Sequence, residues 1–327
     1  MGLLLAIALV WLPRAAQAAP RPLRIAMTDA SKCRHLIALA RESGYLREAG
    51  TEVEVVRVAA RMGKPLEALI LRKVDAMCAT LDMSVLNRMK EAGIRAVADA
   101  GHVPAGGLDR TVLLVRKDLA GKVKGFADLK GMRLGGLHAL SPRYIAFTRE
   151  LRLAGLKPED VRLIPRLGNL LAASMLVKGE LDLAYIAEPE ELLKQGVAEV
   201  FPPSERTRDF FHASLLFFSR DLREGRAADA KAFLTAYLKS AGRFSRMDAA
   251  GRLAALRRLD DRVTEREAAT FLVDPEGRID AGWLRSVQEH AVAAGWIEAG
   301  FQIEAVVDRR PVQQALAALG KQERDER

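Results

Sequence analysis

The chain has little cysteine, and what it has cannot form a disulfide framework. Only Cys33 and Cys78 occur in 327 residues, whereas a small secreted domain held by disulfides needs several pairs. Two alternatives stay open, one disulfide formed in an oxidising compartment or two buried apolar thiols. Half of the residues are hydrophobic, so a sizeable core can form, and the length permits two packed domains or one large one.

Signatures of catalysis and of metal binding are also missing. The sequence contains no G-x-S-x-G, P-loop, H-E-x-x-H or zinc-type Cys/His spacing, so we expect neither an enzyme nor a bound cofactor. Sulfur and imidazole groups that suit a soft metal do crowd two expected strand ends, namely Met27, Cys33, His35, Met77, Cys78 and Met83. They lack a C-x-x-C or H-x-x-x-H spacing, and methionine on a strand usually packs in the core, so we expect no metal site.

The net charge of +9 is not gathered into a basic stripe. Acidic and basic residues are interleaved, as in RESGYLREAG (41–50) and ALRRLDDRVTERE (255–267). This pattern is typical of a solvated surface, and we expect no binding to nucleic acid. The positive balance is compatible with an anionic ligand but does not argue for one.

The only long apolar run lies at the N-terminus. LLLAIALVWL (3–12) is too short to span a bilayer, and Ala16-Gln17-Ala18 follows it as a small-x-small cleavage pattern. We interpret residues 1–18 as a secretory signal peptide cleaved near Ala18, although the usual charged start of such a peptide is missing. The alternative is an uncleaved anchor. The mature chain is expected to be exported, which in a bacterium means the periplasm.

The rest of the chain alternates between strand and helix patterns, which predicts an α/β fold with mostly parallel sheets. From Ala227 to the end the pattern is helical. The expected strands are 22–28, 52–59, 75–81, 93–101, 111–118, 132–137, 181–187 and 214–222, with a further strand after a turn within GLKPEDVRLIPR (155–166).

One helix–strand–helix pattern occurs twice. ALILRKVDAMCATLDMSVL (68–86) and ASMLVKGELDLAYIAEPEELL (173–193) each place a lysine and then an aspartate before a short apolar run. We interpret them as the same element in two α/β lobes joined by crossing segments. The predicted boundaries are 19–108 plus 212–327 for lobe one and 109–211 for lobe two, with a hinge near 104–111 and 205–214.

Several segments, in order, resemble one family. GYLREAGTEVEVV (44–56), FADLKGMRLG (126–135) and KGELDLAYIAEPEELL (178–193) are similar to the nitrate/sulfonate/taurine/thiamine-precursor-type substrate-binding proteins of ABC transporters. The resemblance implies a two-lobed type II periplasmic-binding-protein (Venus flytrap) fold, a small-molecule ligand between the lobes and an ABC permease as partner. Glu188-Pro189-Glu190 lacks the aromatic residue that the family usually has there, so the ligand stays open.

Ligands of open α/β sheets bind beyond the carboxyl ends of the strands. That rule predicts a ligand site with contributions from both lobes. The candidate residues are Thr28, Asp29, Ser31, Lys32, Thr80, Leu81, Asp82, His138, Ser141, Arg143, Tyr185 and Glu188.

The argument for an anionic ligand depends on Ser141, which with Pro142 starts a helix. A helix start offers unpaired N–H groups and partial positive charge, and His138 and Arg143 can add donors. The alternative is that Ser141 is only a cap and that Arg143 points to solvent, which for Arg143 we slightly favour. Both roles can hold together for Ser141.

Three carboxylates argue against an anionic ligand. Asp29, Asp82 and Glu188 follow strands and would repel an anion unless they act as helix caps. Two of them free in the site would suit an amine-bearing ligand, and Tyr185 can stack on an aromatic ring or pack in the core.

We therefore expect a monomeric periplasmic solute-binding protein for an organic anion, such as a sulfonate or carboxylate, or for a small oxyanion. Two alternatives remain. One is a heteroaromatic or amine-bearing, thiamine-precursor-like ligand. The other is a ligand-binding sensor that acts on a membrane kinase.

Overall fold

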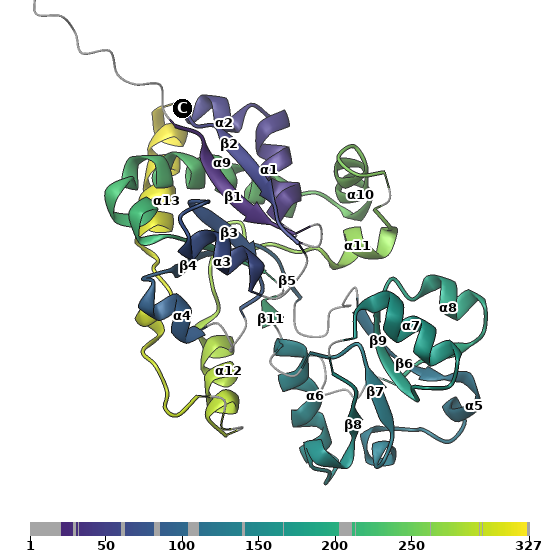
Figure 1. The fold of residues 1–327 in the computed structure, drawn as a ribbon. Coiled ribbons are helices and arrows are strands. Elements are labelled where there is room, and N and C mark those ends of the chain that lie inside the picture. The colour runs from purple at the N-terminus through teal and green to yellow at the C-terminus, as the bar shows by residue number, and fades with distance from the viewer. Residues whose placement is uncertain are drawn as a thin grey trace, which may run out of the picture.

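The computed structural model describes residues 21–327 except 29–30, 32, 60–62, 82–85, 104–110, 139–140, 166, 203–210, 213, 262, 294, 296 and 326–327. The predicted signal peptide and its cleavage site therefore lie outside the described residues. Figure 1 shows two α/β lobes with a short two-stranded connection between them. No described helix combines the length and apolar character needed to cross a membrane.

The first lobe is built on a five-stranded sheet in the order β2-β1-β3-β12-β4. Its strands are β1 (Leu23–Met27), β2 (Val53–Arg57), β3 (Ala76–Ala79), β4 (Arg95–Asp99) and β12 (Leu215–Phe218). Strand β12 alone runs against the others, because it returns from the second lobe. The helices of this lobe are α1 (Cys33–Glu42), α2 (Tyr45–Glu48), α3 (Lys64–Ile70), α4 (Leu86–Glu91), α9 (Ala227–Ser245), α10 (Ala249–Arg257), α11 (Glu265–Thr270), α12 (Ala281–Ala293) and α13 (Arg310–Asp325), with short turns η4 (Asp221–Gly225) and η5 (Ile303–Ala305).

Side chains of the central strand β12 divide between the two faces of this sheet. Leu216 and Phe218 pack under α1 and α9, whereas Leu215 and Phe217 pack on the other face with α12. Alternate residues of a strand point to opposite faces, so a strand covered by helices on both sides must be apolar throughout. This explains the unbroken run LLFF at the centre of the lobe.

The second lobe repeats the plan with a sheet in the order β10-β6-β9-β7-β8. Here β6 is the strand that runs against the others. The strands are β6 (Thr111–Arg116), β7 (Arg133–Gly135), β8 (Arg162–Leu163), β9 (Leu183–Ala187) and β10 (Ala198–Val200). The helices are α5 (Lys117–Ala120), α6 (Pro142–Leu153), α7 (Asn169–Val177) and α8 (Glu190–Lys194), with turns η2 (Phe126–Leu129) and η3 (Pro158–Asp160).

The repeated sequence pattern becomes α3–β3 in one lobe and α7–β9 in the other. Its aspartates, Asp75 and Asp182, have the same role. Asp75 Oδ2 accepts from the backbone N–H of Arg24 at 2.8 Å, and Asp182 Oδ2 accepts from that of Arg133 at 2.9 Å. Each aspartate thus ties the start of its own strand to the start of the neighbouring parallel strand.

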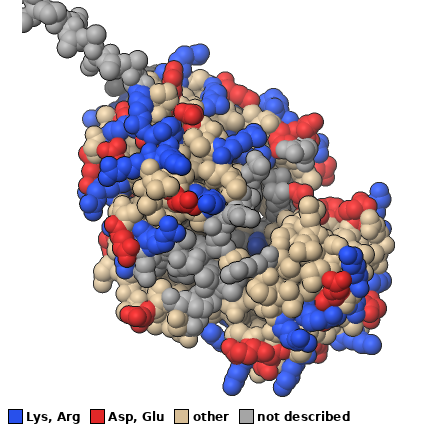
Figure 2. All heavy atoms as spheres, in the orientation of Figure 1, with Lys and Arg blue, Asp and Glu red and all other residues tan. Residues whose placement is uncertain are grey.

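The chain passes between the lobes through β5 (His102–Val103) and β11 (Phe211–His212), which pair antiparallel. These two strands and β10 lie outside the strands that the sequence pattern predicts. In Figure 2 acidic and basic side chains are mixed over much of the visible surface, as the interleaved charge pattern predicts.

Cys33 and Cys78 form a disulfide between the first residue of α1 and strand β3, with their Cα atoms 6.4 Å apart. Of the two alternatives that the sequence left open, the structure has the disulfide. Both residues are fully buried. The bond fixes the loop after β1 next to the end of β3.

Loss of this disulfide should lower the free energy of unfolding by about 2–4 kcal/mol, because it closes a long loop in the unfolded chain. Urea denaturation of the mature chain with and without reductant measures this difference while leaving every side chain in place. A Cys33→Ala/Cys78→Ala variant should show no further effect of reductant. Equal midpoints for the oxidised and reduced wild type would contradict the prediction.

Candidate functional site

In lobe one, two strand ends lie side by side at the candidate site. Ser31 is 5% exposed, and its Oγ donates to the backbone oxygen of Cys78 in β3 at 3.0 Å and accepts from the backbone N–H of Thr28 at 3.0 Å. The Ser31 hydroxyl therefore shapes the loop after β1. Thr28, which follows β1 directly, is half-buried beside it.

The residues after β3 separate into one exposed and one buried side chain. Thr80 is exposed, whereas Leu81 packs in the core with Met77 and Phe217. Leu81 thus helps to hold the loop in place, and Thr80 is the one of the pair whose side chain reaches the surface. The predicted site residues Asp29, Lys32 and Asp82 lie outside the described residues.

In lobe two, the loop after β7 passes close to β9. Gly136 has a φ of +70°, and a Cβ added there would collide with the backbone oxygen of Tyr185. Only glycine combines this left-handed conformation with so close a backbone approach. The loop then leads through the exposed His138 to Ser141 at the start of α6.

Ser141 is the N-cap of α6, as the sequence predicts. Its Oγ accepts from the backbone N–H of Tyr144 at 3.2 Å and donates to the backbone oxygen of His138 at 2.8 Å. The cap aligns the first turn of a 12-residue helix whose amino end carries partial positive charge.

Arg143 is the second residue of the same helix and does not simply extend into solvent. Its guanidinium carbon is 5.7 Å from the centre of the Tyr185 ring, within the range of a cation–π contact. The Tyr185 ring in turn meets Phe147 edge-on, with ring centres 6.2 Å apart. Contacts with Arg143 and with Phe147 hold the Tyr185 ring in a defined position near the end of β9.

The residue after β9 has an unusual backbone. Glu188 is exposed and has a φ of +58°, a conformation that residues other than glycine rarely adopt. The side chain of Asn169 holds the preceding residue, because it accepts from the N–H of Ala187 at 2.7 Å and donates to its oxygen at 3.1 Å. Asn169 thereby fixes where β9 ends and where Glu188 begins.

Within lobe two the structure therefore brings His138, Ser141, Arg143, Tyr185 and Glu188 to the neighbouring ends of β7 and β9. Sequence reasoning missed Gly136 and Asn169, which shape this half of the site. The Gly135-Gly136 pair after a strand was an available signal, whereas nothing local distinguishes Asn169 from an ordinary residue at a helix start.

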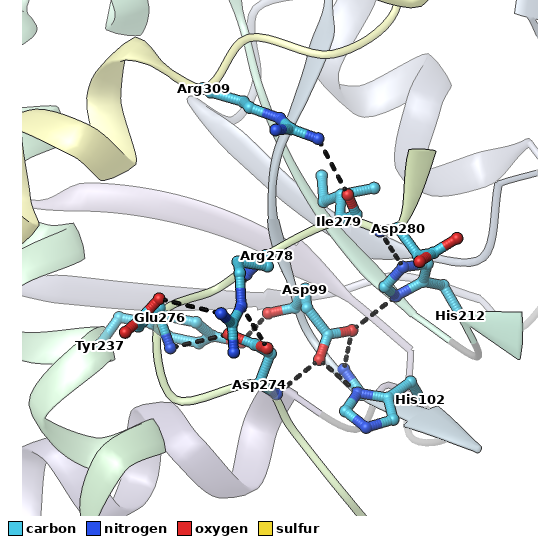
Figure 3. A network of polar contacts seen from close by, with 11 residues as sticks. Asp99, His102, His212, Tyr237, Asp274, Glu276, Arg278, Ile279, Asp280 and Arg309 are labelled. Atoms are coloured by element: carbon cyan, nitrogen blue, oxygen red, sulfur yellow. Dashed lines mark hydrogen bonds and ion pairs between the residues drawn. The ribbon is translucent and has the colours of Figure 1, made fainter. Parts of the chain in front are cut away.

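Between the lobes a buried carboxylate holds the two connecting strands (Figure 3). Asp99, at the end of β4, is fully buried. Its Oδ1 accepts from His212 Nδ1 at 2.8 Å and from Gly101 N–H at 3.2 Å. Its Oδ2 accepts from His102 Nδ1 and Asp274 N–H, each at 2.8 Å. His102 and His212 are partners in the β5–β11 pair, so one carboxylate secures both connections.

The hydrogen bonds also decide which groups are charged. The backbone N–H of Asp280 donates to His212 Nε2 at 2.9 Å, so the proton of this neutral imidazole is on Nδ1. Burial alone would raise the pKa of Asp99, but the hydrogen bonds from His102 and His212 hold this pKa below its ordinary value. The carboxylate therefore stays ionised, and its four donors satisfy it.

A second contact joins the lobes through helices α6 and α12. Thr148 Oγ1 donates to the backbone oxygen of Ile145 at 3.1 Å, so it accepts from His290 Nε2 at 2.9 Å. Ile145 packs in the same apolar cluster as Trp283 of α12. Burial, and to a smaller extent Arg152, lowers the pKa of His290 to about 4.

Replacing Asp99 by asparagine should lower the free energy of unfolding by about 2–4 kcal/mol. The variant puts an amide donor where the carboxylate accepts from other donors, so at least one buried N–H loses its partner. Urea denaturation measures the loss. Asp128→Asn, at an exposed turn in lobe two, is the matched control. An unchanged midpoint for Asp99→Asn would contradict this role.

His290 should make stability fall with acid. Because its folded pKa of about 4 lies below the ordinary value near 6.5, the unfolded chain takes up the proton first. Its contribution is therefore full above about pH 6.5 and declines towards pH 4, by on the order of 3 kcal/mol in total. His290→Gln should reduce this slope in urea denaturation between pH 7 and 4.5. Equal slopes for the wild type and His290→Gln would exclude His290 as the cause.

Comparisons with known proteins bear on the family and the fold. The family described as "NMT1/THI5 like" matches residues 35–245. A search of the curated proteins found no match.

Among solved structures, the ligand-binding component of an ABC-type import system from Staphylococcus aureus, with zinc bound, has a TM-score of 0.70 and 13% identity over 90% of this chain and 99% of that one. The periplasmic aliphatic sulphonate binding protein SsuA from Escherichia coli has a TM-score of 0.66 and 20% identity over 89% and 92%. The desulfurization enzyme DszB has a TM-score of 0.63 and 17% identity over 91% and 100%.

At these identities the solved structures establish the fold alone. The family match covers more than half of the sequence, including both copies of the repeated helix–strand pattern. The chain belongs to the NMT1/THI5-like family and has the two-lobed fold of periplasmic binding proteins.

Proposed function

We propose that the chain is a periplasmic solute-binding protein that captures a small organic anion, such as a sulfonate or carboxylate, or a small oxyanion, and delivers it to an ABC permease. Residues 1–18 are its cleaved signal peptide. Residues 19–108 plus 212–327 form lobe one, and residues 109–211 form lobe two. The observation that carries the proposal is the position of Arg143 on Tyr185, beside the amino end of α6.

Three features of this position favour an anion. The amino end of the 12-residue helix α6 carries partial positive charge. Arg143 adds a guanidinium whose planar donors match the oxygens of a sulfonate or carboxylate. Contact with the Tyr185 ring limits the freedom of the Arg143 side chain, so less entropy is lost when it binds. Two of the solved structures with this fold are sulfonate-binding proteins by name, from Escherichia coli and Xanthomonas axonopodis.

The mechanism is binding without chemistry. Cys33 and Cys78 are joined to each other, so neither offers a thiolate nucleophile or a soft-metal ligand. No group of three or more His, Cys, Asp or Glu side chains is placed to hold a metal within the described parts of the chain. Lobe one contributes the exposed hydroxyl of Thr80, which can donate to a bound anion, whereas the Thr28 hydroxyl donates to Ser31 Oγ at 3.2 Å.

Ligand binding would be accompanied by rigid-body closure of the lobes about β5 and β11. The Asp99 cluster keeps these strands firmly attached to lobe one. We propose a hinge near residues 104–111 and 205–214. A permease would recognise the closed form.

An amine-bearing or heteroaromatic ligand is the second candidate, supported by the Tyr185 ring and the exposed carboxylate of Glu188. Arg143 over that ring argues against it, because the guanidinium repels a cation and occupies one ring face. A sensor that presents the bound ligand to a membrane kinase would use the same site. Deletion of the gene distinguishes the two roles, because only a protein that delivers the ligand to a permease is needed for ligand uptake.

A thermal-shift screen of residues 19–327 should show a raised melting temperature with an anion class and not with amines or pyrimidines. The panel contains nitrate, aliphatic sulfonates, carboxylates, amines, pyrimidines and zinc. For the anion that binds, Arg143→Ala should weaken affinity by about tenfold or more, because a charge-assisted hydrogen bond is lost. Arg149→Ala, on an exposed face of the same helix, is the matched control.

Ser141→Trp should also abolish the shift by blocking the amino end of α6. Its lost cap costs only about 1 kcal/mol of stability, and Asp248→Ala, which removes the cap of α10, controls for that loss. Unchanged affinity in both Arg143→Ala and Ser141→Trp would remove this helix from the site. A shift with amines alone would transfer the proposal to the second candidate.

A further inference from the structure

A hollow of about 610 Å³, which we call the arginine pocket, lies at the β4 edge of lobe one. It is formed by the start of β4, the turn η4, helix α12 and the segment from η5 into α13. Its volume is in the range of small-molecule sites. Six arginines line it, namely Arg95, Arg220, Arg223, Arg285, Arg309 and Arg310.

Positive charge is in excess among the residues that line this arginine pocket. Its three carboxylates are Glu224, Glu304 and Asp308, so three guanidinium charges have no counterpart. A neighbouring hollow of about 750 Å³ shares Arg220 and Glu224 with the arginine pocket. That neighbouring hollow is lined by equal numbers of arginines and carboxylates, three of each. The excess therefore belongs to the arginine pocket and is not a general property of this surface.

The buried acid of the pocket is already saturated. Asp308 Oδ2 accepts from Arg223 Nη1 and Arg310 Nη2, each at 2.7 Å, and its Oδ1 accepts from Arg310 Nε at 2.9 Å. Burial would raise the pKa of Asp308, but these arginines lower it to about 2, so it is fully ionised near neutral pH. Its single negative charge offsets one of the two positive charges of Arg223 and Arg310.

One of these arginines has a buried donor without an acceptor. The side chain of Arg223 is 5% exposed, and its Nη2 donates to the backbone oxygen of Gly93 at 2.7 Å. Its Nε is buried and has no hydrogen-bond partner among the described residues. Such a donor is costly unless an acceptor is present at least part of the time. Burial, and then the charges of Arg223 and Arg220, lower the pKa of Arg95 beside it.

Two helices direct their amino ends to the same place. Ala281, the first residue of α12, and Arg310, the first residue of α13, both line the pocket. These helices have 13 and 16 residues, long enough for their peptide dipoles to add positive potential at the amino end. The carboxylates of Asp280 and Asp308 accept from N–H groups at these two helix starts, so the arginines supply the excess of positive charge.

We propose that the arginine pocket is a second ligand site, which binds a small anion carrying two or more phosphate or carboxylate groups. Guanidinium groups bind both kinds of oxyanion through paired hydrogen bonds. The excess of three positive charges favours a multiply charged ligand over a monovalent one. None of the residues proposed for the ligand between the lobes lines this pocket.

Titration calorimetry on residues 19–327 with inorganic pyrophosphate and with citrate tests the site. Arg285 is exposed on its wall, so Arg285→Glu should fold normally and weaken binding by about tenfold or more. Arg258→Glu, at an exposed position on the end of α10, makes the same change in net charge and should change affinity by less than about twofold. The ligand found in the thermal-shift screen should still stabilise Arg285→Glu, which separates this site from the first.

Vesicles containing cardiolipin, whose headgroup carries two phosphate groups, distinguish a lipid headgroup from a free anion. Binding of soluble pyrophosphate or citrate that Arg285→Glu weakens supports the site with a free ligand. Binding to the vesicles alone, again weakened by Arg285→Glu, supports the same site with a headgroup as its ligand. No binding to any of the three probes, or binding that Arg285→Glu and Arg258→Glu reduce equally, would overturn the proposal.

Discussion

The buried carboxylate of Asp99 is the constraint on which the arrangement of this molecule depends. Four donors converge on it, two from histidines of the connecting strands and two from backbone N–H groups. A buried charge is tolerated only when it is fully hydrogen-bonded, so these four groups cannot separate without a large cost in free energy. Asp99 therefore holds the end of β4, the two crossings between the lobes and the segment before α12 as one unit.

In both lobes an aspartate that accepts from backbone N–H groups also fixes the starts of the strands, at the end opposite to the proposed ligand site. Asp75 and Asp182 bind the N–H groups of Arg24 and Arg133, and each pairing sets the register of two parallel strands. Arginines add to both, with Arg226 on Asp75 and Arg133 itself on Asp182. Because the strand starts are fixed in this way, the strand ends of each lobe reach the surface at defined positions. There the loops carry the residues proposed to bind a ligand.

Arginine side chains form two different kinds of positively charged site in this protein. In lobe two a single arginine, Arg143, is placed against an aromatic ring beside one helix end, which suits selection of a small anion by shape. In lobe one several arginines surround a larger hollow with too few carboxylates to balance them. The first kind of site favours geometric specificity, and the second favours a high total charge.

The amino-acid sequence by itself determined the two α/β lobes, the strand positions to within a few residues and the cap at Ser141. These features depend on the spacing of hydrophobic residues, on glycines and on capping residues, all of which act between near neighbours in the chain. The strand predicted at 132–137 is β7, Arg133–Gly135, and the helix after Ser141 begins where expected. Short strands such as β5 and β11 carry too few residues for a period to show. Only the tertiary structure decided between a disulfide and two thiols at Cys33 and Cys78, and it alone placed Arg143 on Tyr185. It also joined Asp99 to His212 across 113 positions. Such contacts depend on how whole elements pack, and no local pattern encodes which distant side chains packing brings together.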